Sequence, residues 1–68
     1  MKNSVRASRQ QRGLSQAALG ASLGVSRQTV NAVEMGRYMP SLPLAFALAG
    51  FFETTIEGLF EPENGDMR

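Results

Sequence analysis

The chain has 68 residues, a net charge of +1, and neither cysteine nor histidine. A chain of this length forms one domain that buries only about 60% of the surface exposed on unfolding. This composition excludes disulfides and the usual zinc ligands, and predicts a cytoplasmic protein without metal or other cofactor. Residues 1–40 hold six basic and one acidic side chain, whereas residues 41–68 hold one basic and five acidic. The basic half suggests an anionic partner, nucleic acid first.

The sequence also argues against a membrane partner. Its first thirteen residues contain no apolar signal-peptide core. The longest apolar run, residues 42–52, is too short to cross a bilayer core of about 30 Å as a helix. We therefore expect neither export nor anchoring.

Helix-capping residues predict an all-α chain. The predicted helices, in chain order, cover about residues 3–11, 16–23, 27–35, 42–52 and 54–60. Ser15, Ser26 and Ser41 are the predicted N-caps of the three central helices, and glycines follow the first three helices. Either Thr54 or Thr55 opens the last helix, Thr54 having Glu57 as a capping-box partner. The folded domain is expected over residues 1–62, with 63–68 as a flexible tail.

The turn between the second and third helices is the most informative feature. Only residues 24–26 separate the two helices, and so short a turn suits a crossing near 90–120°. Gly20 allows the helices to approach, and Gly24 permits the positive φ that the turn needs. Val30 and Val33 place one face of the third helix in the core. These features predict a helix-turn-helix.

Three stretches carry a family resemblance: "RGLSQAAL", "LGVSRQTVNAVEMG" and the proline at position 40. Over about residues 3–60 the chain resembles the Cro/C1-type, or Xre, family of helix-turn-helix transcriptional regulators, which includes the lambda-type phage repressors. The resemblance implies a compact five-helix, lambda-repressor-like DNA-binding domain. It also implies a repressor that binds a pseudo-palindromic operator in double-stranded DNA as a homodimer. Ser8 and Glu53 depart from the family pattern, where a large apolar residue and a glycine are usual.

The outward face of the third helix carries the candidate base contacts. A rotation of 100° per residue places Arg27, Gln28 and Asn31 opposite the two valines. Arginine suits guanine, whereas glutamine and asparagine suit adenine, although such residues are also common on any solvated surface. The resemblance matches Arg27 and Gln28 to the first two base-reading positions. Asn31, Thr29 and Ala32 are further candidates, Ala32 through a thymine methyl group.

The resemblance implies a supporting set of residues around that helix. The candidate phosphate contacts are Gln16, Ser26, Arg37 and Tyr38. Gln16 matches a position that also braces the first side chain of the recognition helix, and Tyr38 is equally compatible with packing. Arg9 and Glu34 match a buried ion pair that ties the first helix to the third, so we expect a structural role for both.

The fourth helix is apolar around its whole circumference, and a surface helix of this kind is normally covered. We predict a dimer interface that includes Phe46, Phe51, Leu59 and Phe60. Alternatively, the phenylalanines fold over the core of a monomer. A second functional hypothesis is a protein-interaction module, such as an antitoxin-like partner, that uses this surface. An enzyme is disfavoured because the usual catalytic side chains are missing, and no small-molecule ligand is expected.

Overall fold

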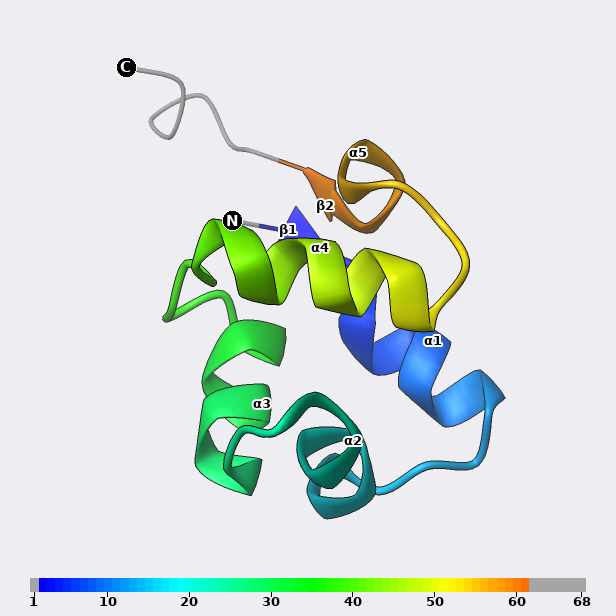
Figure 1. Ribbon diagram of the computed structural model, residues 1–68, viewed down its shortest axis with the longest axis vertical. Helices are drawn as coiled ribbons and strands as arrows, with labels where there is room; N and C mark the ends of the chain where they lie inside the picture. The colour runs from blue at the N-terminus through cyan, green and yellow to red at the C-terminus, as the bar shows by residue number, and fades with distance from the viewer. Residues whose placement is uncertain (1, 62–68) are drawn as a thin grey trace.

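The computed structural model describes residues 2–61 and contains five helices and a short two-stranded ribbon (Figure 1). In chain order the elements are β1 (Lys2–Asn3), α1 (Val5–Gln11), α2 (Gln16–Leu23), α3 (Arg27–Glu34), α4 (Leu42–Phe51), α5 (Ile56–Leu59) and β2 (Phe60–Glu61). The predicted small all-α fold is confirmed. The proposed tail over residues 63–68 lies outside the part of the chain that the structure describes.

The helix starts follow from local hydrogen bonds. Ser15, Ser26 and Ser41 each accept a hydrogen bond at the side-chain oxygen from the backbone N–H three residues on. The three predicted N-caps are therefore confirmed. At the last helix the cap is Thr55, whose hydroxyl accepts from the N–H of Gly58 at 3.0 Å. The capping box from Thr54 to Glu57 was the wrong alternative.

The ribbon was not predicted, and it shortens the first and last helices. β1 and β2 pair antiparallel, with Asn3 opposite Phe60 and Lys2 opposite Glu61. Asn3 therefore precedes α1, and its side-chain oxygen accepts from the N–H of Val5 at 3.1 Å. Phe60 likewise leaves the last helix and enters β2. The ribbon brings the two ends of the described chain together (Figure 1).

One core lies between the helices and the ribbon. Its buried members are Val5, Leu19, Val30, Val33, Ala45, Leu48, Phe52, Leu59 and Phe60. Every element from α1 to β2 contributes at least one of these side chains, so a small chain shares its apolar area among all elements. Within residues 2–61 no helix is long and apolar enough to cross a membrane.

Glu53 lies in the turn after α4, at a position that glycine usually occupies. Its φ is 56°, and it is the one non-glycine residue with positive φ among the described residues. The N–H groups of Glu53 and Thr54 donate to the carbonyls of Gly50 and Ala49 at 3.2 and 2.9 Å, which ends α4 in a Schellman turn. The turn therefore forms despite the departure from the family pattern, at a conformational cost of about 1–2 kcal/mol.

Candidate nucleic-acid interface

The turn between α2 and α3 fixes how the two helices cross (Figure 1). Gly24 has a φ of 75°, and the N–H of Val25 donates to the carbonyl of Gly20 at 2.9 Å. A Cβ atom on Gly20 would lie 2.6 Å from the carbonyl oxygen of Val25, closer than side-chain carbons come to backbone oxygens. The absence of a side chain at position 20 therefore lets the turn pack directly against α2.

The structure separates an inward from an outward face on α3. Val30 and Val33 are 4% and 2% exposed and belong to the core. Arg27, Gln28 and Asn31 are exposed on the opposite side. The two lesser candidates, Thr29 and Ala32, are half-buried. The hydroxyl of Thr29 lies 3.0 Å from that of Ser26, so it is already engaged within the helix cap.

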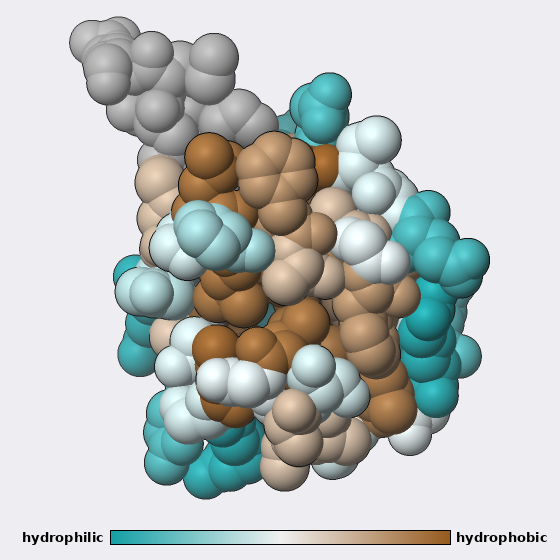
Figure 2. All heavy atoms as spheres, in the orientation of Figure 1, coloured by the Kyte–Doolittle hydropathy of each residue, from teal (hydrophilic) through white to brown (hydrophobic). Residues whose placement is uncertain are grey.

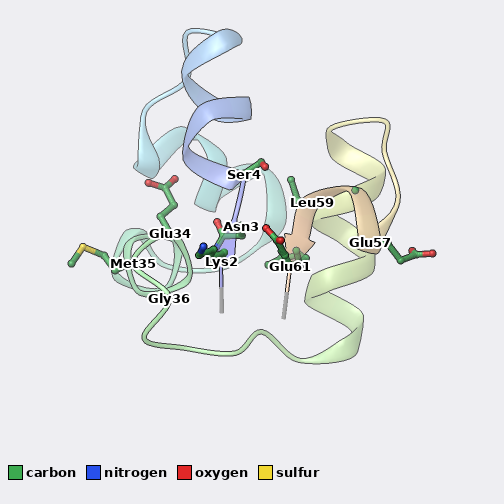
Figure 3. Close-up of a pocket in the computed structure, with 11 residues that line it drawn as sticks. Lys2, Asn3, Ser4, Glu34, Met35, Gly36, Glu57, Leu59 and Glu61 are labelled. Carbon is green, nitrogen blue, oxygen red and sulfur yellow. The ribbon is translucent and has the colours of Figure 1, made fainter. Parts of the chain in front are cut away.

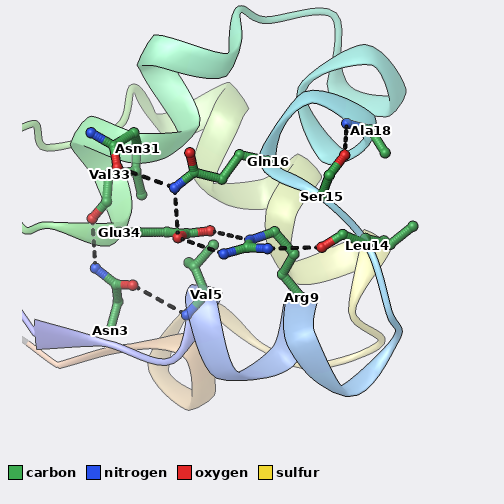
Figure 4. Close-up of polar contacts among 10 residues, drawn as sticks. All are labelled: Asn3, Val5, Arg9, Leu14, Ser15, Gln16, Ala18, Asn31, Val33 and Glu34. Atoms are coloured by element: carbon green, nitrogen blue, oxygen red, sulfur yellow. Dashed lines mark hydrogen bonds and ion pairs between the residues drawn. The ribbon is translucent and has the colours of Figure 1, made fainter.

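A chain of polar contacts connects α1, α2 and α3 behind this face (Figure 4). Arg9 donates through Nε and Nη2 to the two carboxylate oxygens of Glu34, at 2.6 and 3.1 Å. Arg9 also donates through Nη1 to the carbonyl of Leu14 at 2.8 Å. Gln16 Nε2 donates to both Glu34 Oε1 and Asn31 Oδ1, each at 3.1 Å. Four side chains from three helices thus form one connected network.

The charge state of the network follows from its geometry. The side chains of Arg9 and Glu34 are only 11% and 3% exposed. Burial alone would raise the pKa of Glu34, but the hydrogen bonds from Arg9 and Gln16 and the positive charge of Arg9 outweigh it and hold that pKa below its ordinary value of 4.5. The hydrogen bond to Glu34 raises the pKa of Arg9. Both groups are therefore charged at neutral pH.

The four candidate phosphate contacts differ in exposure and in the hydrogen bonds that they make within the protein. Arg37 and Tyr38 are exposed in the loop after α3, Tyr38 at 46%. The hydroxyl of Ser26 accepts from the N–H of Thr29 at 3.1 Å, so it acts as a cap. Both hydrogens on Gln16 Nε2 are used within the protein, and the residue that Gln16 braces is Asn31 rather than Arg27. The backbone N–H of Gln16, in the first turn of α2, is the better donor for a phosphate.

Two arginines, one in α1 and one directly after it, have roles that sequence reasoning missed. Arg6 is exposed and, with Gln16 and Asn31, lines a small hollow of about 160 Å³ beside the outward face of α3. The sequence could have indicated this role, because Arg6 lies three residues before Arg9 and therefore on the same side of α1. Arg12 instead lies over the rings of Phe51 and Phe52, 5.6 and 5.4 Å from their centroids. Arg12 therefore covers apolar surface, whereas Arg6 adds exposed positive charge near α3.

The predicted dimer residues divide into exposed and buried. Phe46 is 61% exposed, and Phe51 is partly buried against the core. Leu59 and Phe60 are 2% and 6% exposed, because α5 and β2 fold over the core of the same chain. Both side chains therefore pack mainly within the core of this chain, and their place in a dimer interface stays a prediction.

An apolar surface nevertheless remains over α4 and towards α5 (Figure 2). Its exposed members Met39, Leu42 and Phe46 are each more than half exposed. Next to them lies an open groove of about 560 Å³, lined by Met39, Pro40, Leu42, Ala45, Ile56, Glu57, Phe60 and Glu61. We call this surface and groove together the α4 face.

A polar hollow of about 790 Å³ lies beside the ribbon, between β1, the end of α3 and the α5–β2 segment (Figure 3). Its labelled side chains do not converge, because Met35 and Glu57 point outwards on opposite sides. Within residues 2–61 no group of three histidine, cysteine or carboxylate side chains is placed to hold a metal ion. The exposed face of α3 is therefore the stronger candidate site.

Comparison with known proteins identifies the fold family. The sequence model of the helix-turn-helix family matches residues 5–59. The chain belongs to the Cro/C1-type helix-turn-helix family. The match spans α1 to α5, so it includes both the crossing of α2 and α3 and the network behind it. The family comprises DNA-binding transcriptional regulators, which are typically not enzymes.

Similar helix-turn-helix proteins occur in archaea and in bacteria. An uncharacterised HTH-type transcriptional regulator of Methanocaldococcus jannaschii is 47% identical over 66 residues, which is 97% of this chain and all of that protein. The uncharacterised regulator YgzD of Bacillus subtilis is 47% identical over 94% of this chain and all of its own length. A third, from Archaeoglobus fulgidus, is 40% identical over 88% of this chain and 86% of its own. Small helix-turn-helix proteins of this size are thus found in both groups.

Proposed function

We propose that this helix-turn-helix protein is a sequence-specific repressor of the cytoplasm that inserts α3 into the major groove of double-stranded DNA. The observation that carries the proposal is the division of α3 into two faces. Val30 and Val33 anchor the helix in the core, and Arg27, Gln28 and Asn31 stay exposed on the opposite side. An α-helix fits the major groove, where each base pair presents its own pattern of donors and acceptors.

Arg27 and Gln28 are the principal base readers in this proposal. They begin α3, and the N-terminal residues of a recognition helix are those that contact base edges. Arginine pairs with guanine O6 and N7, and glutamine pairs with adenine N6 and N7. Ala32 and Thr29 are secondary, because both are half-buried and the Thr29 hydroxyl is engaged by Ser26.

The phosphate contacts surround this face. The first turns of α2 and α3 present backbone N–H groups, which suit an anionic oxygen. Arg6 and Arg37 supply exposed positive charge on α1 and in the loop after α3, and Tyr38 supplies a hydroxyl. Such contacts set the position of the protein on the duplex without reading its sequence.

Two arginine substitutions should separate base reading from phosphate binding. We expect Arg27→Ala to relax the preference at one base pair and to cost about 1–3 kcal/mol on the preferred sequence. Arg37→Ala should weaken binding to all sequences alike and reduce the salt slope by about 1. Selection from randomised duplexes, followed by affinity measurements over a range of salt concentrations, measures both effects. A loss of base preference in Arg37→Ala but not in Arg27→Ala would reverse the two roles.

We also propose that two copies associate through the α4 face and bind half-sites about 34 Å apart. Patches of exposed apolar side chains on small proteins commonly mark interaction sites, and Leu42 and Phe46 are 65% and 61% exposed. A two-fold dimer also suits a pseudo-palindromic operator, because each α3 then meets an equivalent half-site.

Phe46→Lys should separate the subunits and leave the fold intact. Because Phe46 is exposed, the free energy of unfolding should change by no more than about 0.5 kcal/mol. If Phe46 anchors the interface, dimer affinity should fall by about 2 kcal/mol or more. Sedimentation velocity at several protein concentrations measures the change. Gln10→Lys, at an exposed position of α1, is the matched control. An unchanged dimer in Phe46→Lys would place the interface elsewhere.

The second candidate is a protein-interaction module, such as an antitoxin-like partner. The observation that favours it is the composition of the groove, where Glu57 and Glu61 lie beside Met39 and Leu42. An apolar groove with acidic side chains suits a basic, apolar segment of another protein. Salt-sensitive DNA binding by the isolated chain supports the repressor. Absence of DNA binding at low salt, together with tight association with a different protein, supports the module.

A further inference from the structure

The side chain of Asn3 connects the start of the chain to the end of α3 (Figure 4). Its Nδ2 donates to the carbonyl of Val33 at 2.8 Å, across thirty positions of the sequence. Its Oδ1 accepts from the N–H of Val5 at 3.1 Å. A carbonyl only accepts and a backbone N–H only donates, so the two partners determine the orientation of the Asn3 amide. The amide is therefore held in one orientation between α1 and α3.

The ribbon fixes the backbone that carries this side chain. Asn3 lies opposite Phe60, and the N–H of the following residue, Ser4, donates to the carbonyl of Leu59 at 2.9 Å. The residues around this junction belong to the core, with Phe60, Leu59 and Val5 at 6%, 2% and 0% exposure. The side chain of Asn3 therefore contacts α3 from an anchored position.

The carbonyl that Asn3 binds belongs to the turn that ends α3. Gly36 has a φ of 72°, and its N–H donates to the same Val33 carbonyl at 3.0 Å. The N–H of Arg37 donates to the carbonyl of Ala32, also at 3.0 Å. These two hydrogen bonds form a Schellman turn, which sets the direction in which the chain leaves the helix. Asn3 thus holds, from outside, the turn that places Arg37.

We propose that Asn3 is a positioning residue for DNA binding, because its hydrogen bond to Val33 fixes the turn that presents Arg37 to a phosphate. This inference rests on the proposed function, in which Arg37 contacts the DNA backbone. Ordering a loop at an interface costs free energy, and a turn that is already fixed in the free protein lowers this cost. Phosphate contacts carry no sequence information, so Asn3 affects affinity and not base preference.

Two substitutions of Asn3 separate the contact with α3 from the contact with α1. In Asn3→Asp a carboxylate oxygen still accepts from the N–H of Val5, but nothing donates to the carbonyl of Val33. Asn3→Ala removes both contacts. Ser4→Asp is the matched control for the added charge, because Ser4 is the exposed neighbour and its side chain makes no capping hydrogen bond to α1.

Affinity measurements over a range of salt concentrations give the first test. Beyond any effect of Ser4→Asp, Asn3→Asp should weaken binding to all duplexes alike and reduce the salt slope by about 1, as Arg37→Ala does. In the Arg37→Ala background, Asn3→Asp should cause no further loss. Normal binding by Asn3→Asp, beside weak binding by Asn3→Ala, would assign the effect to α1 and overturn the inference. Equal losses with and without Arg37 would also overturn it.

A second measurement needs no DNA. In the ¹⁵N-labelled free protein, backbone relaxation should show Gly36 and Arg37 to be as rigid as α3. Asn3→Asp and Asn3→Ala should both make this turn mobile and leave the first turn of α3 unchanged. A turn that is mobile in the unchanged chain, or rigid in both variants, would overturn the inference. A turn that behaves as expected in a chain that binds no duplex at low salt would instead refute the proposed function.

Discussion

Replacing Glu34 with alanine should lower the free energy of unfolding by about 3–5 kcal/mol, because it leaves the Arg9 guanidinium buried without its counter-charge. A domain of this size has a total stability of only about 3–10 kcal/mol. The variant should therefore be substantially unfolded at physiological temperature. Urea unfolding followed by circular dichroism, compared with the unchanged chain, measures the loss.

Two companion variants show whether the loss comes from the unpaired charge. The double variant Arg9→Met/Glu34→Met should be more stable than Glu34→Ala, because it removes both charges and keeps apolar volume. Glu34→Gln should remove one source of acid sensitivity. Since the pKa of Glu34 is lowered in the folded chain, the ionised Glu34 stabilises the fold above about pH 4.5, and this stabilisation is lost as the pH falls below that value. A Glu34→Ala variant as stable as the unchanged chain would contradict the structural role of the pair.

Two glycine substitutions should change stability in opposite directions. In Gly20→Ala the new Cβ atom meets the backbone oxygen of Val25, and this overlap should destabilise the fold by about 1–3 kcal/mol. The higher helix propensity of alanine offsets at most about 1 kcal/mol of that loss. Gly50→Ala should stabilise α4 by about 0.5–1 kcal/mol, since nothing lies within 4 Å of its added Cβ. Thermal unfolding of both variants measures whether each substitution raises or lowers the stability of the fold.

Gly20 and Gly50 can be compared directly, because both lie inside helices and neither has a positive φ. Gly20→Ala should also weaken DNA binding in proportion to its effect on the α2–α3 crossing, whereas Gly50→Ala should leave binding unchanged. Equal stabilisation by both substitutions would mean that the close approach at Gly20 does not set the turn.

The parts of the fold that sequence predicted are those with a local cause. Ser15 and Ser26 predicted the starts of α2 and α3, because a serine hydroxyl accepts a hydrogen bond from a backbone N–H in the first turn of each helix. Gly20 and Gly24 predicted the helix-turn-helix because each relieves a steric conflict at a fixed place in it. The outward face of α3 followed from the positions of two valines and the helical period.

The features that were missed depend on contacts between distant residues. The ribbon pairs Asn3 with Phe60 and is only two residues long on each side, too short for an alternating pattern. The four residues of α5 are likewise too few to indicate a buried face, so Leu59 was assigned to the surface. Nor did any local signal show that Glu53 would take a left-handed conformation.

The bracing of Asn31 by Gln16 illustrates the same limit within the candidate site. The two residues are fifteen positions apart, and their contact depends on Glu34, which in turn is held by Arg9. Residue types indicated a polar face that suits DNA, but only the folded arrangement showed that Asn31 on that face is hydrogen-bonded to Gln16 (Figure 4).

Binding of DNA by the outward face of α3 can be tested directly by titrating the ¹⁵N-labelled protein with its selected duplex and recording the NMR signals of its backbone and side chains. We expect the largest changes on Arg27, Gln28 and Asn31, with smaller changes at the first turn of α2 and in the loop at Arg37. Changes concentrated on Met39, Leu42 and Phe46 of the α4 face, with the outward face of α3 unaffected, would contradict it.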